Sequence, residues 1–110
     1  MDLELTIMNI INFSGDARSL CMEAIEYAKS GEIDKSRDYI DKANSKLAQA
    51  HRSQTMLIQE EAKGEGNPVS LLMVHAQDHL MNAITVKDMA MEFIDLYILI
   101  RGIKGVEING

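Results

Sequence analysis

The 110-residue sequence lacks tryptophan and contains one proline, one cysteine, two phenylalanines and three tyrosines. This scarcity of aromatic residues argues against a β-sheet protein, whose strands favour them. The apolar content of 46% comes mostly from alanine, isoleucine, leucine and eight methionines, a composition typical of helices packed by aliphatic side chains. A single cysteine excludes an internal disulfide, so we expect Cys21 to be a small buried hydrophobic residue in a reducing cytoplasm.

Basic residues are also in short supply. The chain has eleven basic and seventeen acidic residues, and its net charge of -6 repels nucleic-acid backbones and anionic lipid surfaces. Its first residues, MDLELTIMNII, carry acids where a secretory signal needs bases. The most apolar segment, MAMEFIDLYILI, covers about half of a bilayer span and contains Glu92 and Asp95. We therefore expect no nucleic-acid partner, no membrane insertion and a cytoplasmic location.

Apolar residues recur every three or four positions along three long segments, as one face of a helix requires. The first predicted helix runs from Leu3 to Ala28 and ends near the dipeptide Ser30-Gly31. Gly15 in its middle implies either the close approach of another backbone or a bend. The second predicted helix is capped by Asp34 and extends to about Ala62.

The third predicted helix starts at Pro68, after a capping asparagine, and runs to Arg101, where Gly102 stops it. Two short connections between three long helices predict an all-α fold, an antiparallel up-down-up three-helix bundle over residues 1–102. Residues 103–110 are expected to form a loose C-terminal tail. The third helix is apolar on nearly every side, and two neighbours from the same chain cannot cover it. We therefore predict that the chain self-associates through this helix.

Polar residues interrupt the apolar stripe of the third helix within the stretch VHAQDHLMNAIT. Because a helix turns about 100° per residue, five of them fall within about one third of its circumference: His75, Asp78, His79, Asn82 and Thr85. A lone histidine on an apolar face is usually a packed core residue, and His51 on the second helix is expected to be one. The close spacing of the cluster in the third helix calls for a chemical explanation.

Three chemical uses fit this cluster. His75 could be a nucleophile that takes a phosphoryl group, with a second histidine binding the phosphate oxygens. Two histidines at positions i and i+4 could instead bind zinc with Asp78 as a third ligand, although HAQDH lacks the HExxH arrangement of metalloproteases. The cluster could also be a polar layer that fixes the register of an oligomer. Spacing alone leaves all three uses open.

The same stretch carries a family resemblance. VHAQDHLM, preceded by PVSLL, resembles the enzyme IIA component of the lactose/cellobiose branch of the bacterial sugar phosphotransferase system, which also handles N,N'-diacetylchitobiose. Two further segments are similar to that family: NFSGDARSLCMEAI in the first helix, and AHRSQTMLIQEEAKGEG across the second helix and its turn. The resemblance covers nearly all of residues 4 to 100.

The resemblance implies a three-helix bundle that assembles into a homotrimer and acts as a phosphoryl carrier in sugar uptake. By that resemblance, His75 accepts the group from the histidine-containing phosphocarrier protein and passes it to the cysteine of enzyme IIB. His79 and Gln77 match positions that line the active site, and Asp78 matches an aspartate that meets its copies around a metal ion at the trimer axis. Three converging carboxylates repel strongly unless they are protonated or bridged by a hard cation, which makes Mg²⁺ the expected metal.

Overall fold

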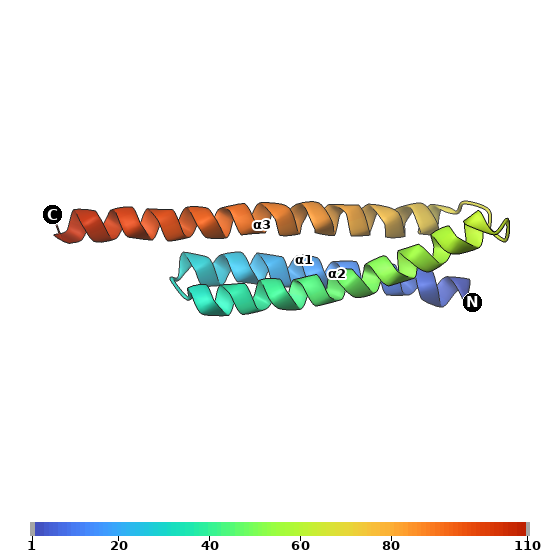
Figure 1. The fold of residues 1–110 in the computed structure, drawn as a ribbon, viewed down its shortest axis with the longest axis horizontal. Coiled ribbons are helices and arrows are strands. Elements are labelled where there is room, and N and C mark those ends of the chain that lie inside the picture. The colour runs from blue at the N-terminus through green and yellow to red at the C-terminus, as the bar shows by residue number, and fades with distance from the viewer. Residues whose placement is uncertain (1, 110) are drawn as a thin grey trace.

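The computed structural model describes residues 2–109, with side chains described up to Gly102. It contains three long helices: α1 (Leu3–Lys29), α2 (Ile33–Ala62) and α3 (Leu71–Asn109). The helices lie side by side along a body of 66 × 20 × 17 Å, with α1 and α3 running in one direction and α2 in the other (Figure 1). The predicted up-down-up bundle is therefore confirmed.

The ends of α1 agree with the sequence prediction. Asp2 caps its start, because its carboxylate accepts a hydrogen bond of 3.1 Å from the backbone N–H of Leu5. Ser30 is the C-cap of α1, and Gly31 follows with a φ of 83°, a left-handed conformation that favours glycine. The turn also receives Arg101 of α3, whose Nη2 donates to the carbonyl oxygen of Lys29 at 3.3 Å. The last turn of α1 and the distant end of α3 are therefore joined.

The starts of α2 and α3 differ from the prediction. Asp34 lies inside the first turn of α2 rather than at its cap, where Glu32 stands without a side-chain cap bond. The carboxylate of Asp34 still favours the positive end of the helix dipole there. Helix α3 begins at Leu71 and not at Pro68, because the Ser70 hydroxyl accepts a 3.1 Å hydrogen bond from the backbone N–H of Met73.

The predicted stop at Gly102 is wrong, since α3 continues to Asn109. A glycine inside a helix costs only about 1 kcal/mol and ends the helix only when it takes a positive φ, which Gly31 and Gly64 do and Gly102 does not. The side chains of residues 103–110 lie outside the described residues, so the predicted domain boundary at residue 102 stays a prediction.

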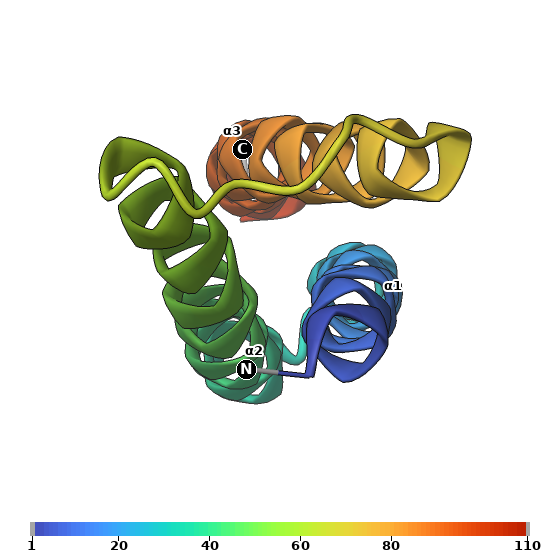
Figure 2. The ribbon, with the colours of Figure 1, turned by 90° about the vertical axis from the view of Figure 1, so that its right-hand side faces the viewer.

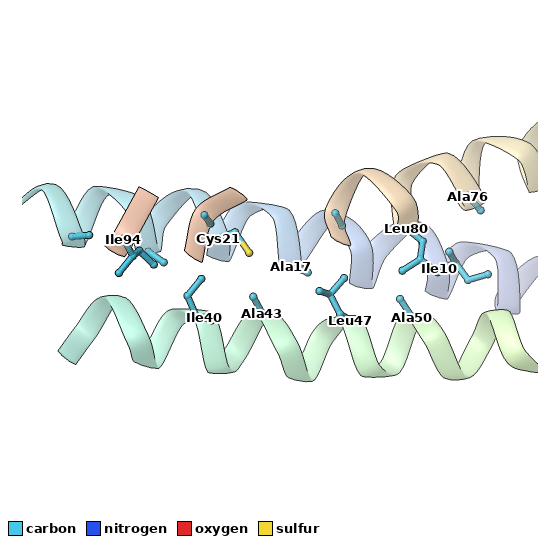
Figure 3. Close-up of a cluster of buried hydrophobic side chains, with 14 of the residues drawn as sticks. Ile10, Ala17, Cys21, Ile40, Ala43, Leu47, Ala50, Ala76, Leu80 and Ile94 are labelled. Atoms are coloured by element: carbon cyan, nitrogen blue, oxygen red, sulfur yellow. The ribbon is translucent and has the colours of Figure 1, made fainter. Parts of the chain in front are cut away.

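The core lies between the three helices and consists largely of alanine and a few aliphatic residues (Figure 3). In α1 and α2 the buried residues follow the predicted apolar periodicity, whereas the buried stripe of α3 consists largely of alanines that the pattern of large apolar residues did not indicate. The core residues are Ile7, Ile10, Ala17, Cys21, Ala24 and Ala28 from α1, Ile40, Ala43, Leu47 and Ala50 from α2, and Ala76, Leu80, Ala83, Ala90 and Ile94 from α3. Small side chains allow the helix axes to approach closely. Cys21 is fully buried, as expected, and burial raises the pKa of its thiol to about 11.

Gly15 was predicted to mark a close backbone approach or a bend. A Cβ placed on Gly15 would have no neighbouring atom within 4 Å, so no backbone of the same chain approaches it closely.

Viewed along the bundle, α2 is tilted relative to α1, and its far end leads into the connection to α3 (Figure 2). That connection, residues 63–70, is exposed throughout.

One face of α3 points away from α1 and α2 and is predominantly apolar. Seven of its side chains are more than 40% exposed although they are large and hydrophobic: Leu71, Val74, Met81, Met89, Phe93, Leu96 and Leu99. We call these seven residues the outward face of α3. The prediction that two neighbours cannot cover this helix is confirmed for the single chain.

Candidate functional site

The two histidines of HAQDH form a direct side-chain pair on α3. The ring centroids of His75 and His79 lie 4.5 Å apart with the planes at 82°, so the edge of one ring meets the face of the other. His75 is exposed and His79 is partly buried. One imidazole is thus open to a visiting protein while a second lies beside it. His51 is exposed on α2, so the prediction that it is a packed core histidine is wrong.

Asp78 lies next to this pair on the surface of α3, about 60° around the helix axis from His75. Its Oδ2 accepts a hydrogen bond of 3.3 Å from the Asn82 Nδ2, one helical turn further on. Both residues line a hollow of about 370 Å³ with His79, Thr85, Val86 and the α1 residue Arg18. The carboxylate therefore faces a hollow that lies on the outward face of α3 and is bordered by Arg18 of α1.

Gln77 lies on the other side of α3 from His75, because two residues along a helix correspond to about 200°. Its side-chain oxygen accepts a short hydrogen bond of 2.7 Å from the Gln54 Nε2 of α2. Gln77 also borders a smaller hollow of about 80 Å³ beneath the connection from α2 to α3. Within one chain, Gln77 thus serves the contact between α2 and α3, and its amide nitrogen is left to donate elsewhere.

The structure therefore brings His75, His79 and Asp78 to one side of α3 and holds Gln77 on another. Sequence reasoning did not single out Arg18 or Gln54. Both lie in segments that resemble the family, Arg18 in NFSGDARSLCMEAI and Gln54 in AHRSQTM. Their location in these segments is the sequence feature that could have pointed to them. Neither residue follows an apolar periodicity, which is the pattern that identified the helices.

The described part of a single chain holds no group of three or more histidine, cysteine or acidic side chains that could bind a metal ion. Asp78 supplies one carboxylate, and only one of its oxygens is engaged, by Asn82. Such a carboxylate is a ligand type that Mg²⁺ accepts, but a protein-bound cation would need carboxylates from several chains. The residues present thus fit a metal site only in an oligomer.

Sequence comparison assigns a family to this fold and site. The profile of the family described as "PTS system, Lactose/Cellobiose specific IIA subunit" matches residues 5–98. The chain belongs to this family. It is therefore a IIA component of the phosphotransferase system, and the resemblance noted in the sequence is confirmed.

Individual relatives agree with this assignment. The IIA chain is 51% identical over 107 residues to the lichenan-specific phosphotransferase enzyme IIA component of Bacillus subtilis (strain 168), with 97% of each chain covered. It is 42% identical over 96 residues to the lactose-specific EIIA component of Staphylococcus epidermidis, covering 87% of this chain and 92% of that one.

Solved structures have the same fold. The cellobiose-specific enzyme IIA from Bacillus anthracis superposes with a TM-score of 0.85 at 46% identity, covering 100% of this chain and 95% of the other. A IIA(Chitobiose) chain from an Escherichia coli complex with HPr gives a TM-score of 0.81 at 36% identity, covering 92% and 98%. None of the helices within residues 2–109 of the IIA chain is long and apolar enough to cross a membrane.

Proposed function

We propose that the IIA chain carries a phosphoryl group on His75, taken from the histidine-containing phosphocarrier protein and passed to the cysteine of enzyme IIB. The observation that supports this most directly is an exposed imidazole with a second imidazole 4.5 Å away, inside the segment that matches the family. The E. coli relative was solved in a complex with HPr, which supports a phosphocarrier of that kind as the donor.

The chemistry needs one nucleophilic nitrogen and little else. A neutral imidazole nitrogen of His75 attacks phosphorus, and the new P–N bond forms as the P–N bond to the donor histidine breaks. In the second step the thiolate of enzyme IIB attacks, so a P–S bond forms and His75 recovers its lone pair. Such transfers pass through a loose transition state, for which the protein mainly supplies alignment and charge stabilisation. A rigid helix supplies the alignment.

Two neighbouring residues are proposed to assist. His79, whose ring contacts that of His75, donates a ring N–H to the phosphoryl oxygens and compensates part of their charge. Gln77 lines the site from the side of α2, with its carbonyl held by Gln54 and its Nε2 available as a donor. Because Gln77 points away from the His75 of its own helix, this role requires a second copy of the chain.

We further propose that the active species is a homotrimer with the outward face of α3 at its centre. An apolar surface of this length on a monomer would favour aggregation, and burial against two copies removes it from water. Asp78 lies in the middle of that surface, so three copies of the carboxylate converge and bind a divalent cation, preferentially Mg²⁺. When bound, the cation would offset most of the negative charge of the three carboxylates, and the proposed transfer steps would not involve it.

The imported sugar is proposed to be a lactose- or cellobiose-type disaccharide, which agrees with the lichenan, lactose and cellobiose names of the relatives. The transfer is proposed to take place in the cytoplasm. A reducing compartment keeps the enzyme IIB cysteine and the buried Cys21 as free thiols.

The decisive experiment is phosphorylation by purified components. Incubation with phosphoenolpyruvate, enzyme I and the phosphocarrier should place one acid-labile phosphate on each chain, measured by intact mass before and after acid treatment. His75→Ala should abolish the label, whereas His51→Ala, which removes another exposed histidine, should keep it. A non-catalytic helical oligomer predicts no label, and a zinc hydrolase predicts stoichiometric zinc and an activity that chelation abolishes. A chain that takes no acid-labile phosphate, or one that binds stoichiometric zinc and loses its activity on chelation, would refute the proposal.

Asp78→Leu tests the axial site separately. The variant should lose its bound divalent metal, as measured by elemental analysis, and should remain trimeric in sedimentation because an apolar residue replaces a repelling charge. Asp95→Leu changes another exposed carboxylate of α3, about 100° around the helix from Asp78, and should leave the metal content unchanged. An Asp78→Leu trimer with unchanged metal content would contradict the axial site.

A further inference from the structure

Within residues 2–102, whose side chains are described, nothing requires a glycine at position 15 in the middle of α1. Its φ is not positive, and a Cβ at this position would meet no atom within 4 Å. Inside a helix, glycine is nevertheless less favourable than alanine. We infer that the surface of α1 centred on Gly15 binds the outward face of α3 of a second copy, and that the absent side chain lets the two helices approach closely. This inference rests on the self-association proposed above and identifies the surface that receives the outward face.

A second row of residues runs along α1 beside the row that forms the core. Its positions are separated alternately by three and four residues, the spacing with which one helix packs along another. We call this row the Gly15 face, and it consists of Met8, Ile11, Gly15, Arg18, Met22 and Ile25. Met8 and Met22 are 37% and 52% exposed, and both isoleucines are only partly buried. The row extends over roughly 25 Å and is apolar except at Arg18, so its shape and polarity suit a second helix.

The Gly15 face adjoins the outward face of α3. Viewed along the bundle, α2 packs on one side of α1 and α3, and no helix of residues 2–109 covers the opposite side (Figure 2). Lys46 of α2 lies over the ring of Phe13, about 160° around α1 from Gly15, so α2 leaves the Gly15 face uncovered. The hollow of about 370 Å³ crosses the border, because Arg18 and residues of α3 line it together. The two faces are therefore parts of one continuous surface.

Charge favours a second copy as the occupant of the Gly15 face. Arg18 is the one charged residue of this face, and the outward face of α3 carries the exposed carboxylate of Glu92, about 40° around the helix from Leu96. The ion pairs among the described residues include neither Arg18 nor Glu92. Each chain thus presents an apolar surface with a base on α1 and an apolar surface with an acid on α3, which are complementary. If each copy offers one face to the next, the contacts close into a ring.

The contact also brings a second copy beside the site proposed for phosphorylation. His79 lines the same hollow as Arg18, and its ring contacts that of His75. A helix bound on the Gly15 face therefore borders the hollow next to the imidazole pair. This placement agrees with the role proposed for Gln77, which requires a second copy of the chain.

The test makes the same substitution at two helical glycines of the full chain. Gly15→Leu places a large side chain on the proposed contact. Gly102→Leu is the matched control, because a Cβ there also meets no atom within 4 Å and the residue lies about 120° around α3 from Leu96. Dye-labelled chains are sedimented over a dilution series to obtain the apparent dissociation constant of the assembly, and circular dichroism checks that each variant is helical.

Gly15→Leu should have an apparent dissociation constant at least tenfold above that of Gly102→Leu, because a close contact between helices does not accommodate an added side chain. A smaller difference would overturn the inference.

Gly15→Ala in a Leu96→Glu background separates the contact from the fold. The glutamate places a charge on the outward face, so the chains should be single. In such chains Gly15→Ala should raise the urea midpoint, because alanine is the better helix former and the added methyl group meets no atom. An unchanged or lower midpoint would show that the single chain itself needs the glycine, and the inference would be wrong. Phosphate uptake by the unmodified chain is measured separately, and its absence would refute the proposed function without affecting the contact.

Discussion

The turn between α1 and α2 allows a quantitative test of the fold. Gly31 has a φ of 83°, and a Cβ at this position would overlap the guanidinium group of Arg101. That guanidinium donates to the carbonyl oxygen of Lys29 at 3.3 Å, in the last turn of α1. Gly31→Ala therefore has two consequences, a strained backbone and a displaced arginine.

The two costs can be estimated separately. An L-residue in the left-handed region costs about 1 kcal/mol. The end of the arginine side chain is flexible and can swing away, so the overlap costs no more than the hydrogen bond and the favourable charge at the C-terminus of α1. For an exposed contact these are worth about 1 kcal/mol together. Gly31→Ala should therefore lower the free energy of unfolding by about 2 kcal/mol.

Gly64 provides the matched control. It has a φ of 77°, but a Cβ there would meet no atom within 4 Å. Gly64→Ala should therefore cost only the backbone term, about 1 kcal/mol. In an Arg101→Gln background the excess cost of Gly31→Ala should disappear, since its second contribution is already lost. Urea denaturation followed by circular dichroism at one fixed protein concentration measures the free energy of unfolding of the unmodified chain, the three single variants and the double variant. Equal costs of Gly31→Ala and Gly64→Ala would refute the assigned role of Arg101.

Three further predictions concern the core, the outward face and the contact between α2 and α3. Burial raises the pKa of Cys21 to about 11, so unfolding is favoured by thiol ionisation as pH rises from the unfolded value of 9.0. The unmodified chain should lose about 2 kcal/mol of stability relative to Cys21→Ala between pH 9 and 11, and an equal pH dependence would contradict this. Leu96→Glu should yield monomers in sedimentation, whereas Met56→Glu, an exposed change on α2, should not; a trimeric Leu96→Glu chain would exclude the outward face as the interface. Gln54→Leu leaves the oxygen of Gln77 without its 2.7 Å partner and should cost about 1 to 2 kcal/mol in urea denaturation, and no loss would show that the bond is not formed in solution.

Periodicity predicted the three helices, because burial of apolar surface dominates the energetics of such a bundle. On α1 the recurring apolar residues Ile10, Ala17 and Cys21 are fully buried core positions. On α3, which is apolar on nearly every side, periodicity did not identify the buried stripe, and the small residues Ala76 and Ala83 occupy it. The predicted self-association of the chain has the same physical basis. A helix with apolar residues on every side has more such surface than two neighbours can bury, and the exposed Leu96 and Phe93 are the consequence.

Helix ends were less predictable, because several residues compete for one cap within a few positions. Asn67 followed by proline is a good capping sequence, yet Ser70 is the residue that caps α3, because its hydroxyl accepts from the backbone N–H of Met73 in the first turn. Gly102 shows the same weakness, since glycine permits a left-handed stop without imposing it. In both cases alternatives differ by about 1 kcal/mol, and a local motif cannot decide between them.

Local spacing predicted only those contacts of the site that lie within one helix. Positions one turn apart on a helix are neighbours whatever the rest of the fold does, so spacing placed His75 beside His79. The partner of Gln77 lies 23 residues away on another helix, at Gln54, and no local spacing encodes that contact. Family resemblance named Gln77 as a site residue but did not reveal that its side chain is turned toward α2.

The position of His75 would link the proposed phosphoryl transfer to the proposed assembly. Around α3, the core-facing residues and the outward face lie on nearly opposite sides, and His75 is at the border, about 60° from the residue proposed for the axis. A histidine at the centre of the outward face would be sealed by trimer formation, and one on the core side would be covered by α1. At the border, the imidazole would stay exposed in the proposed trimer while the helix that carries it is held on both sides. A trimer contact that fixes α3 would then also fix the proposed nucleophile, so weakening the outward face should reduce the rate of transfer without any change at His75.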